Sequence, residues 1–124
     1  MGYLDIVFLG TGTSQGVPVI GCDCEVCLSN DEKDKRLRSS ILITSDKGTQ
    51  ITIDAGPDFR TQMLNKRVKY LDAILVTHAH RDHVSGLDDV RSYNYLQQSP
   101  MPIFANKPAI KSIKNEFSYA FAQV

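Results

Sequence analysis

The stretch AILVTHAHRDHVSG, residues 73–86, contains every histidine of this 124-residue chain. The apolar run at 71–77 predicts a β-strand, because it is short and bounded by polar residues. Side chains that directly follow such a strand lie at the edge where open sheets place their functional sites. The residues at that edge are His78, His80, Asp82 and His83.

This cluster has the composition of a metal site. Neutral imidazole and carboxylate are standard ligands for zinc and similar divalent ions. His78 and His80 are two residues apart, so in an extended segment they point to the same side and can bind one metal together. Asp82 and His83 begin the next turn and can reach a second metal position nearby. The pattern H-x-H-x-D-H therefore favours a metal site over a solvated turn that is rich in histidine.

The composition indicates one soluble domain. Apolar residues make up 42% of the chain, and the 14 acidic residues balance the 14 basic ones. A net charge near zero gives no general attraction to nucleic acid or to an anionic membrane, so neither partner is expected. No apolar run has the length of a membrane span, and the N-terminus lacks the features of a secretory signal. We expect a cytoplasmic protein.

Hydrophobic periodicity predicts a sheet with helices packed against it. The strands come first along the chain, and strands and helices then alternate, which is typical of the α/β and α+β classes. Strand 3–10 has the composition of a buried strand, and a glycine-rich loop follows at 10–21. The other expected strands are 39–45, 49–55, 71–77 and 101–105, and the expected helices are 58–67, 87–97 and 107–117.

Three cysteines form a second candidate metal site. Cys22, Cys24 and Cys27 have the spacing C-x-C-x₂-C within the loop at 21–29. Three thiolates at this spacing can bind one tetrahedral structural zinc, and an odd set of clustered cysteines argues against a disulfide framework. A redox thiol cluster and plain buried cysteines remain alternatives. The fourth ligand is open: water, a neighbouring molecule or Asp23 could supply it.

Four stretches together resemble a known family. THAHRDHVSGL (77–87) is similar to the signature of the metallo-β-lactamase-fold hydrolases, ITIDAGPD (51–58) resembles their strand ending in Asp-x-Gly, and FLGTGTSQGVP (8–18) resembles their first strand and glycine turn. GTGTSQGVPVIGCDCEVC (10–27) resembles one branch more specifically. That branch contains phosphoribosyl cyclic phosphate phosphodiesterase and relatives of the tRNA 3′-processing nucleases.

The resemblance implies a fold and a set of metal ligands. Residues 1–124 would form the N-terminal half of an αββα sandwich, with a mixed sheet and helices on one face. Two divalent ions, zinc or manganese, would be bound at the site, by His78 and His80 for the first ion and by Asp82 and His83 for the second. Asp54 would form hydrogen bonds behind the ligands, although a simple turn-forming role for this residue is equally open.

The resemblance also implies a reaction. We expect a phosphodiesterase that acts on a small cyclic phosphate or nucleotide-like ester through a hydroxide bound to two metals, with Asp82 helping to orient that hydroxide. Alternatives are a tRNA 3′-processing type of nuclease, a lactonase or thioesterase, and a non-catalytic metal-binding half-domain. The family's remaining ligands have no counterpart after His83, so the chain alone is expected to be inactive. A half-domain also exposes apolar surface and sheet edges, so it is expected to form homo-oligomers. Arg81 is either a phosphate contact or a solvated arginine.

Overall fold

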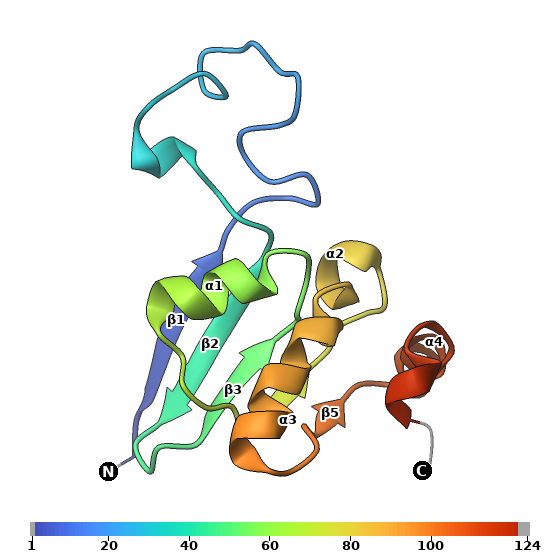
Figure 1. Cartoon of the computed structure of the whole chain (residues 1–124). Helices are drawn as coiled ribbons and strands as arrows, with labels where there is room; N and C mark the ends of the chain where they lie inside the picture. The colour runs from blue at the N-terminus through green and yellow to red at the C-terminus, as the bar shows by residue number, and fades with distance from the viewer. Residues whose placement is uncertain (1, 122–124) are drawn as a thin grey trace.

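A single mixed sheet organises the chain. The computed structural model describes residues 2–121. The five strands lie side by side in sequence order, the first three pair antiparallel and the last three pair parallel (Figure 1). This confirms the mixed α/β sheet expected from the sequence. The strands are β1 (Leu4–Gly10), β2 (Ser40–Ser45), β3 (Gln50–Ile53), β4 (Ala73–Leu75) and β5 (Ile103–Phe104).

Helices cover one face of this sheet, as expected. In Figure 1, α1 (Phe59–Lys66) and α3 (Arg91–Gln97) lie in front of the strands, and α4 (Lys107–Glu116) lies beyond β5. The expected helix at 87–97 begins as a 3-10 turn, Leu87–Val90, and the other two helices end within one residue of the expected position. The sequence did not predict the short helix α2 (Arg81–Val84) or the 3-10 turns at Glu32–Asp34 and Ser118–Phe121.

The helices begin and end at residues suited to those positions. The Asn106 side chain accepts a hydrogen bond from the Ala109 amide at 3.0 Å and caps α4, while Arg67 adopts a left-handed conformation (φ 51°) and ends α1. Among residues 2–121, no helix is both long and apolar enough to cross a membrane.

The core lies between the helices and the covered face of the sheet. Phe59 of α1 meets Tyr93 of α3 edge to face, with ring centroids 6.3 Å apart, and the Tyr93 hydroxyl donates to the Val68 carbonyl at 2.6 Å. Burial raises the pKa of Tyr93 to about 12. Met63 joins the core, whereas Leu64, which shares the helical spacing of these residues, is 59% exposed. The other large apolar side chains that are fully buried are Leu71, Ile74, Val84 and Ile113.

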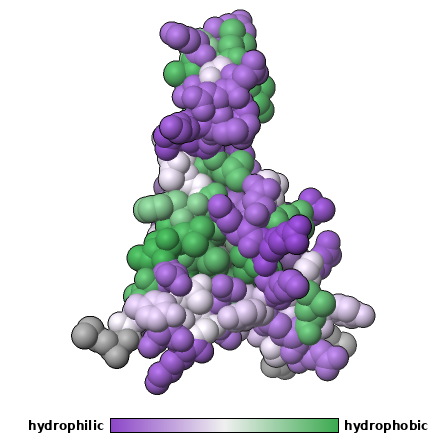
Figure 2. Space-filling model, turned by 90° about the vertical axis from the view of Figure 1, so that its left-hand side faces the viewer, coloured by the Kyte–Doolittle hydropathy of each residue, from purple (hydrophilic) through white to green (hydrophobic). Residues whose placement is uncertain are grey.

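The opposite face of the sheet is apolar and uncovered. The expectation that strand 3–10 is buried is wrong, because β1 is an edge strand, and Leu4, Ile6 and Phe8 are each more than half exposed. Figure 2, which views the β1 side, shows hydrophobic surface below the projecting loop. The strand register places these side chains on the same face as Ile41, Ile43, Ile51, Ile53, Leu75 and Phe104, and we call this set the open sheet face.

A long loop, residues 11–39, projects from the end of the sheet between β1 and β2 (Figure 1). Val17 and Arg36 exchange two backbone hydrogen bonds of 2.9 and 2.8 Å across its base. Arg38 then joins the loop to the residue before α1: its backbone N–H and its guanidinium both donate to Asp58, at 2.8 and 3.0 Å. This loop carries the three cysteines.

We expect the isolated chain to self-associate through the open sheet face. Burying apolar surface is favourable by about 25 cal/mol per Å², and two flat apolar sheet faces can pack against each other. Sedimentation velocity should therefore show a species larger than the monomer. Phe8→Lys should shift the chain towards monomer, whereas Tyr95→Lys, which replaces an even more exposed aromatic on α3, should not. A wild-type chain that stays monomeric at high concentration would contradict this expectation.

Candidate metal centre

Two loops come together at the carboxyl ends of β3 and β4. These strands are parallel, so the segments after them meet at the same edge of the sheet. The Ala55 amide donates to the His83 carbonyl at 2.8 Å, and the Gly86 amide donates to the Ala55 carbonyl at 2.9 Å. The Asp-x-Gly segment and the histidine segment therefore form one hydrogen-bonded unit.

This contact leaves no room for a side chain at two glycines. A Cβ atom on Gly56 would lie 2.0 Å from the Asp82 carbonyl oxygen, and one on Gly86 would lie 2.0 Å from the Gly56 carbonyl oxygen. Both are backbone atoms that cannot move aside easily. Glycine at position 56 thus allows the loop after β3 to lie directly against the backbone of Asp82.

Asp54 connects the two loops through its side chain. It is 4% exposed and adopts a left-handed backbone conformation (φ 67°). Its carboxylate accepts hydrogen bonds from the Thr77 amide at 2.8 Å, the Thr77 hydroxyl at 2.7 Å and His83 Nδ1 at 2.6 Å. Asp54 therefore forms the turn and also supports the histidine segment, so the two roles left open by the sequence occur together.

These hydrogen bonds fix the ring nitrogens that are free to bind a metal. The Thr77 hydroxyl donates its one proton to Asp54. Its oxygen also lies 2.9 Å from His78 Nδ1, and in this second contact it can only accept. His78 therefore carries a proton on Nδ1. His83 Nδ1 likewise donates to Asp54. In neutral His78 and His83, Nε2 then carries the lone pair that a metal requires. Thr77 was not predicted as a site residue, and only its position directly before the first histidine pointed to it.

The four candidate ligands lie close together. The His78 ring is 4.4 Å from the His80 ring and 4.1 Å from the His83 ring, centroid to centroid. His83 Nε2 faces Asp82 Oδ2 at 3.1 Å. Imidazole nitrogen and carboxylate oxygen are both ligand atoms for divalent ions, and this contact places the two side by side. The donor set therefore fits a divalent cation.

The ligands do not form one compact cage. Within residues 2–121, the three cysteines are the only group of three or more metal-binding side chains whose ligand atoms all lie within 4.8 Å of one another. The His78 ring instead lies between the other two rings, slightly nearer to His83 than to His80. Because the four side chains do not converge as one group, a bound metal would need further ligands.

The cysteine cluster has the geometry of a zinc site. Cys22, Cys24 and Cys27 are free thiols whose sulfur atoms converge, and Asp23 does not belong to this group among the residues described. The Cys27 amide donates to Cys24 Sγ, and the Val19 amide donates to Cys27 Sγ, both at 3.4 Å. Backbone N–H groups that point at sulfur favour the thiolate, which is the form that binds metal.

The thiols differ in acidity. The Cys27 amide and the neighbouring Cys22 and Cys27 thiols lower the pKa of Cys24 to about 7. At Cys27 the Val19 amide lowers the pKa, but desolvation and the Cys22 and Cys24 thiols outweigh it and leave the pKa raised. Cys24 thus loses its proton more readily than Cys27 at neutral pH.

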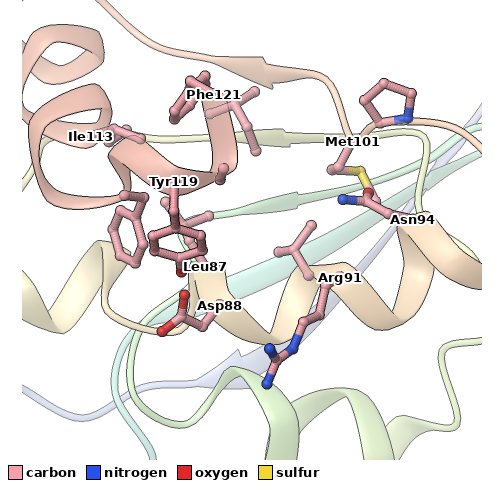
Figure 3. A pocket seen from close by; sticks show the side chains of 13 residues that line it. Leu87, Asp88, Arg91, Asn94, Met101, Ile113, Tyr119 and Phe121 are labelled. Carbon is pink, nitrogen blue, oxygen red and sulfur yellow. The ribbon is translucent and has the colours of Figure 1, made fainter. Parts of the chain in front are cut away.

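A separate apolar cavity lies between α3 and α4. It has a volume of about 220 Å³, and Figure 3 shows Leu87, Met101, Ile113 and Phe121 around it, with Asp88 and Arg91 at one side. None of the four candidate metal ligands lines it. We therefore place the candidate reaction site at the histidine segment and not in this cavity.

Comparisons with known proteins agree with this geometry. Residues 49–124 match the family model of the beta-lactamase superfamily domain. A crystal structure described as a new diphosphatase from the PhnP family superposes with a TM-score of 0.92 at 44% identity, covering 98% of this chain and 49% of that one. Zinc-bound PqqB from Methylobacterium extorquens superposes with a TM-score of 0.74 at 26% identity, covering 93% and 40%.

The name of one curated relative describes a transferase. A Porphyromonas gingivalis protein named octanoyltransferase is 46% identical over 115 residues, which are 93% of this chain and 23% of that protein. The chain thus spans about half the length of the diphosphatase and about a quarter of the octanoyltransferase.

The role of Asp54 predicts an order of stabilities. Asp54→Ala removes the two oxygens that accept three hydrogen bonds and places alanine at a positive φ, so it should lower the free energy of unfolding by about 2–4 kcal/mol. Asp54→Asn keeps one acceptor oxygen, and asparagine tolerates this backbone conformation. The free energy of unfolding should therefore fall by about half as much. Urea denaturation measures both, with the exposed Asp46→Ala as control. An equal fall in the free energy of unfolding in all three variants would contradict the role of Asp54 as the acceptor that joins the two loops.

The cysteine cluster predicts a zinc content. Metal analysis of the purified chain should find one tightly bound zinc, which the double variant Cys22→Ser/Cys24→Ser should lose, since thiolates are the ligands. His78→Ala should retain this zinc, because it alters only the histidine segment. Unchanged zinc content in the double variant would refute the site.

Proposed function

This chain belongs to the β-lactamase superfamily, and on that basis we propose that the whole protein is a metal-dependent phosphodiesterase acting on a small cyclic phosphate or nucleotide-like ester. The main support is the Asp54–Thr77–His78 and Asp54–His83 hydrogen-bond network, which orients two imidazoles beside Asp82. The 44% identity to a protein described as a diphosphatase supports phosphate ester chemistry.

Each residue has a distinct role in this proposal. His78 and His80 would bind one divalent ion, zinc or manganese, and Asp82 and His83 a second. Two such ions supply Lewis acidity and a nucleophilic water at neutral pH. Asp82 is partly exposed, with 21% of its side chain accessible, so its carboxylate can also accept a hydrogen bond from the attacking water and orient it. Asp54 and Thr77 position the imidazoles and do not touch substrate.

The cysteine loop has a structural role. A zinc held by Cys22, Cys24 and Cys27 would stabilise a segment that has few apolar contacts: Ile20 at its outer part is fully exposed. Free thiols and a zinc of this kind persist in a reducing compartment, and we therefore propose a cytoplasmic location.

A second candidate is hydrolysis of an acyl ester or thioester. The name of the Porphyromonas gingivalis relative, octanoyltransferase, favours an acyl substrate. However, the similarity covers 23% of that protein, so the name can describe the remaining three quarters. A nuclease is less favoured, because a chain with 14 basic and 14 acidic residues has no net attraction for long RNA.

The whole protein should hydrolyse bis-p-nitrophenyl phosphate when supplied with Mn²⁺ or Zn²⁺. His78→Ala and Asp82→Asn should each lower kcat/KM by about 100-fold, because ligand loss weakens metal binding. Asp88→Asn, an exposed carboxylate beyond the site, should leave the rate unchanged. A protein that ignores phosphodiesters and hydrolyses octanoyl thioesters would refute the proposal in favour of the second candidate.

A further inference from the structure

The cavity between α3 and α4 has an unsatisfied polar atom in its wall. Asn94 of α3 lines the cavity, and Figure 3 shows its amide group beside Met101. The Asn94 Oδ1 atom is buried, and among residues 2–121 it has no hydrogen-bond partner. A buried carbonyl oxygen without a donor costs free energy, so each such atom in a folded protein calls for an explanation.

Two other buried side-chain atoms in the described part of the chain lack a partner, but they differ from Asn94 Oδ1 in one respect. These atoms are Thr52 Oγ1 and Gln62 Oε1, and neither residue lines this cavity. Only Asn94 thus combines an unpartnered oxygen with the open space of this cavity, in which a hydrogen-bond donor from outside the chain can lie.

The rest of the cavity wall is mainly apolar. It is formed by the 3-10 turn Leu87–Val90, by β5 and the residues before it, by α4 and by the 3-10 turn Ser118–Phe121 (Figure 3). The apolar side chains include Leu87, Val90, Met101, Ile103, Ile113 and Phe117. Protein interiors are close-packed and contain few voids larger than a water molecule, so an apolar space of about 220 Å³ is large for a chain of this size.

The volume and the lining favour a compact organic molecule over water. A buried water molecule makes about two to four hydrogen bonds, and a mainly apolar wall offers few partners. Cavities lined by apolar side chains stay dry, and one of about 150 Å³ binds benzene. The larger cavity of this protein therefore has room for a molecule of the size of a two-ring aromatic compound.

The charged residues at the cavity favour a neutral ligand. Asp88 and Arg91 lie at one side of it in Figure 3, and both side chains are exposed. Their opposite charges cancel, so neither an anion nor a cation gains a net attraction there. The hydrogen-bonding group that the ligand must satisfy is the acceptor Asn94 Oδ1, and this requires an N–H or O–H donor.

We propose that this cavity is a binding site for a compact, neutral, mainly apolar molecule that carries one hydrogen-bond donor. The donor would bind Asn94 Oδ1, and the rings would contact Met101 and Ile113. None of the four candidate metal ligands lines the cavity, so the site is separate from the candidate metal centre. The inference does not rest on the proposed function, and a protein inactive on every phosphodiester would leave it intact.

Three ring systems of nearly the same shape test this inference in the whole protein. Indole carries an N–H donor, benzofuran has an acceptor oxygen at that position, and indene has neither. In NMR titrations indole should bind with a dissociation constant below about 1 mM, about 5- to 10-fold more tightly than benzofuran or indene. Equal affinities, tighter binding of benzofuran, or no binding of indole would each overturn the inference.

Isoleucine methyl signals show where indole binds. Ile103 and Ile113 line the cavity, so their methyl signals should shift on addition of indole. Ile41 and Ile43 belong to the open sheet face, and their signals should stay in place. Shifts confined to the open sheet face would indicate binding to exposed apolar surface and would also overturn the inference.

Asn94→Leu tests the hydrogen bond itself. It keeps a side chain of similar size and removes the acceptor, so indole should bind no more tightly than indene, while the affinity for indene should change less than about 2-fold. The variant loses no hydrogen bond of Oδ1, since this atom has none among the described residues. Asn65→Leu, the same change at an exposed position of α1, should keep the preference for indole. A preference that persists in Asn94→Leu would refute the role of Asn94.

Discussion

The buried carboxylate of Asp54 is the interaction on which the site depends. It lies at the end of β3, and its three hydrogen bonds all go to the segment that follows β4. A charged group with 4% exposure is stable in such a place only when its acceptors are satisfied, and here each bond also sets a feature of the site. One bond fixes the backbone at Thr77, one fixes the Thr77 hydroxyl and one fixes the His83 ring. The position of the imidazoles therefore follows from the burial of a single acid.

The same edge of the sheet shows how backbone packing and side-chain chemistry support each other. Gly56 and Gly86 allow the two loops to touch through backbone atoms, and Asp54 then reaches the histidines without a gap. The result is that the His78 and His83 rings are held through Nδ1, which leaves Nε2 for a metal.

Much of this could be predicted from the sequence, because it depends on local patterns. The histidine spacing after an apolar run located the candidate site, and alternation and helical spacing located the strands and three helices. Other features depended on partners distant in sequence. Strand β1 is as apolar as a buried strand, but only its position at the sheet edge shows that Phe8 is exposed. Similarly, nothing near Thr77 in sequence indicates that its hydroxyl lies 2.7 Å from Asp54, and nothing near Arg81 indicates that Glu116 pairs with it.

Helix α4 separates three tasks onto three faces. Ile113 and Ala109 hold it in the core, Ser112 and Asn115 are exposed beside the histidine segment, and Lys107, Lys111 and Lys114 form a basic side. A mutation on one face leaves the other two largely intact. The two exposed sides of this helix can therefore vary in sequence over evolutionary time without disturbing the contacts that anchor it.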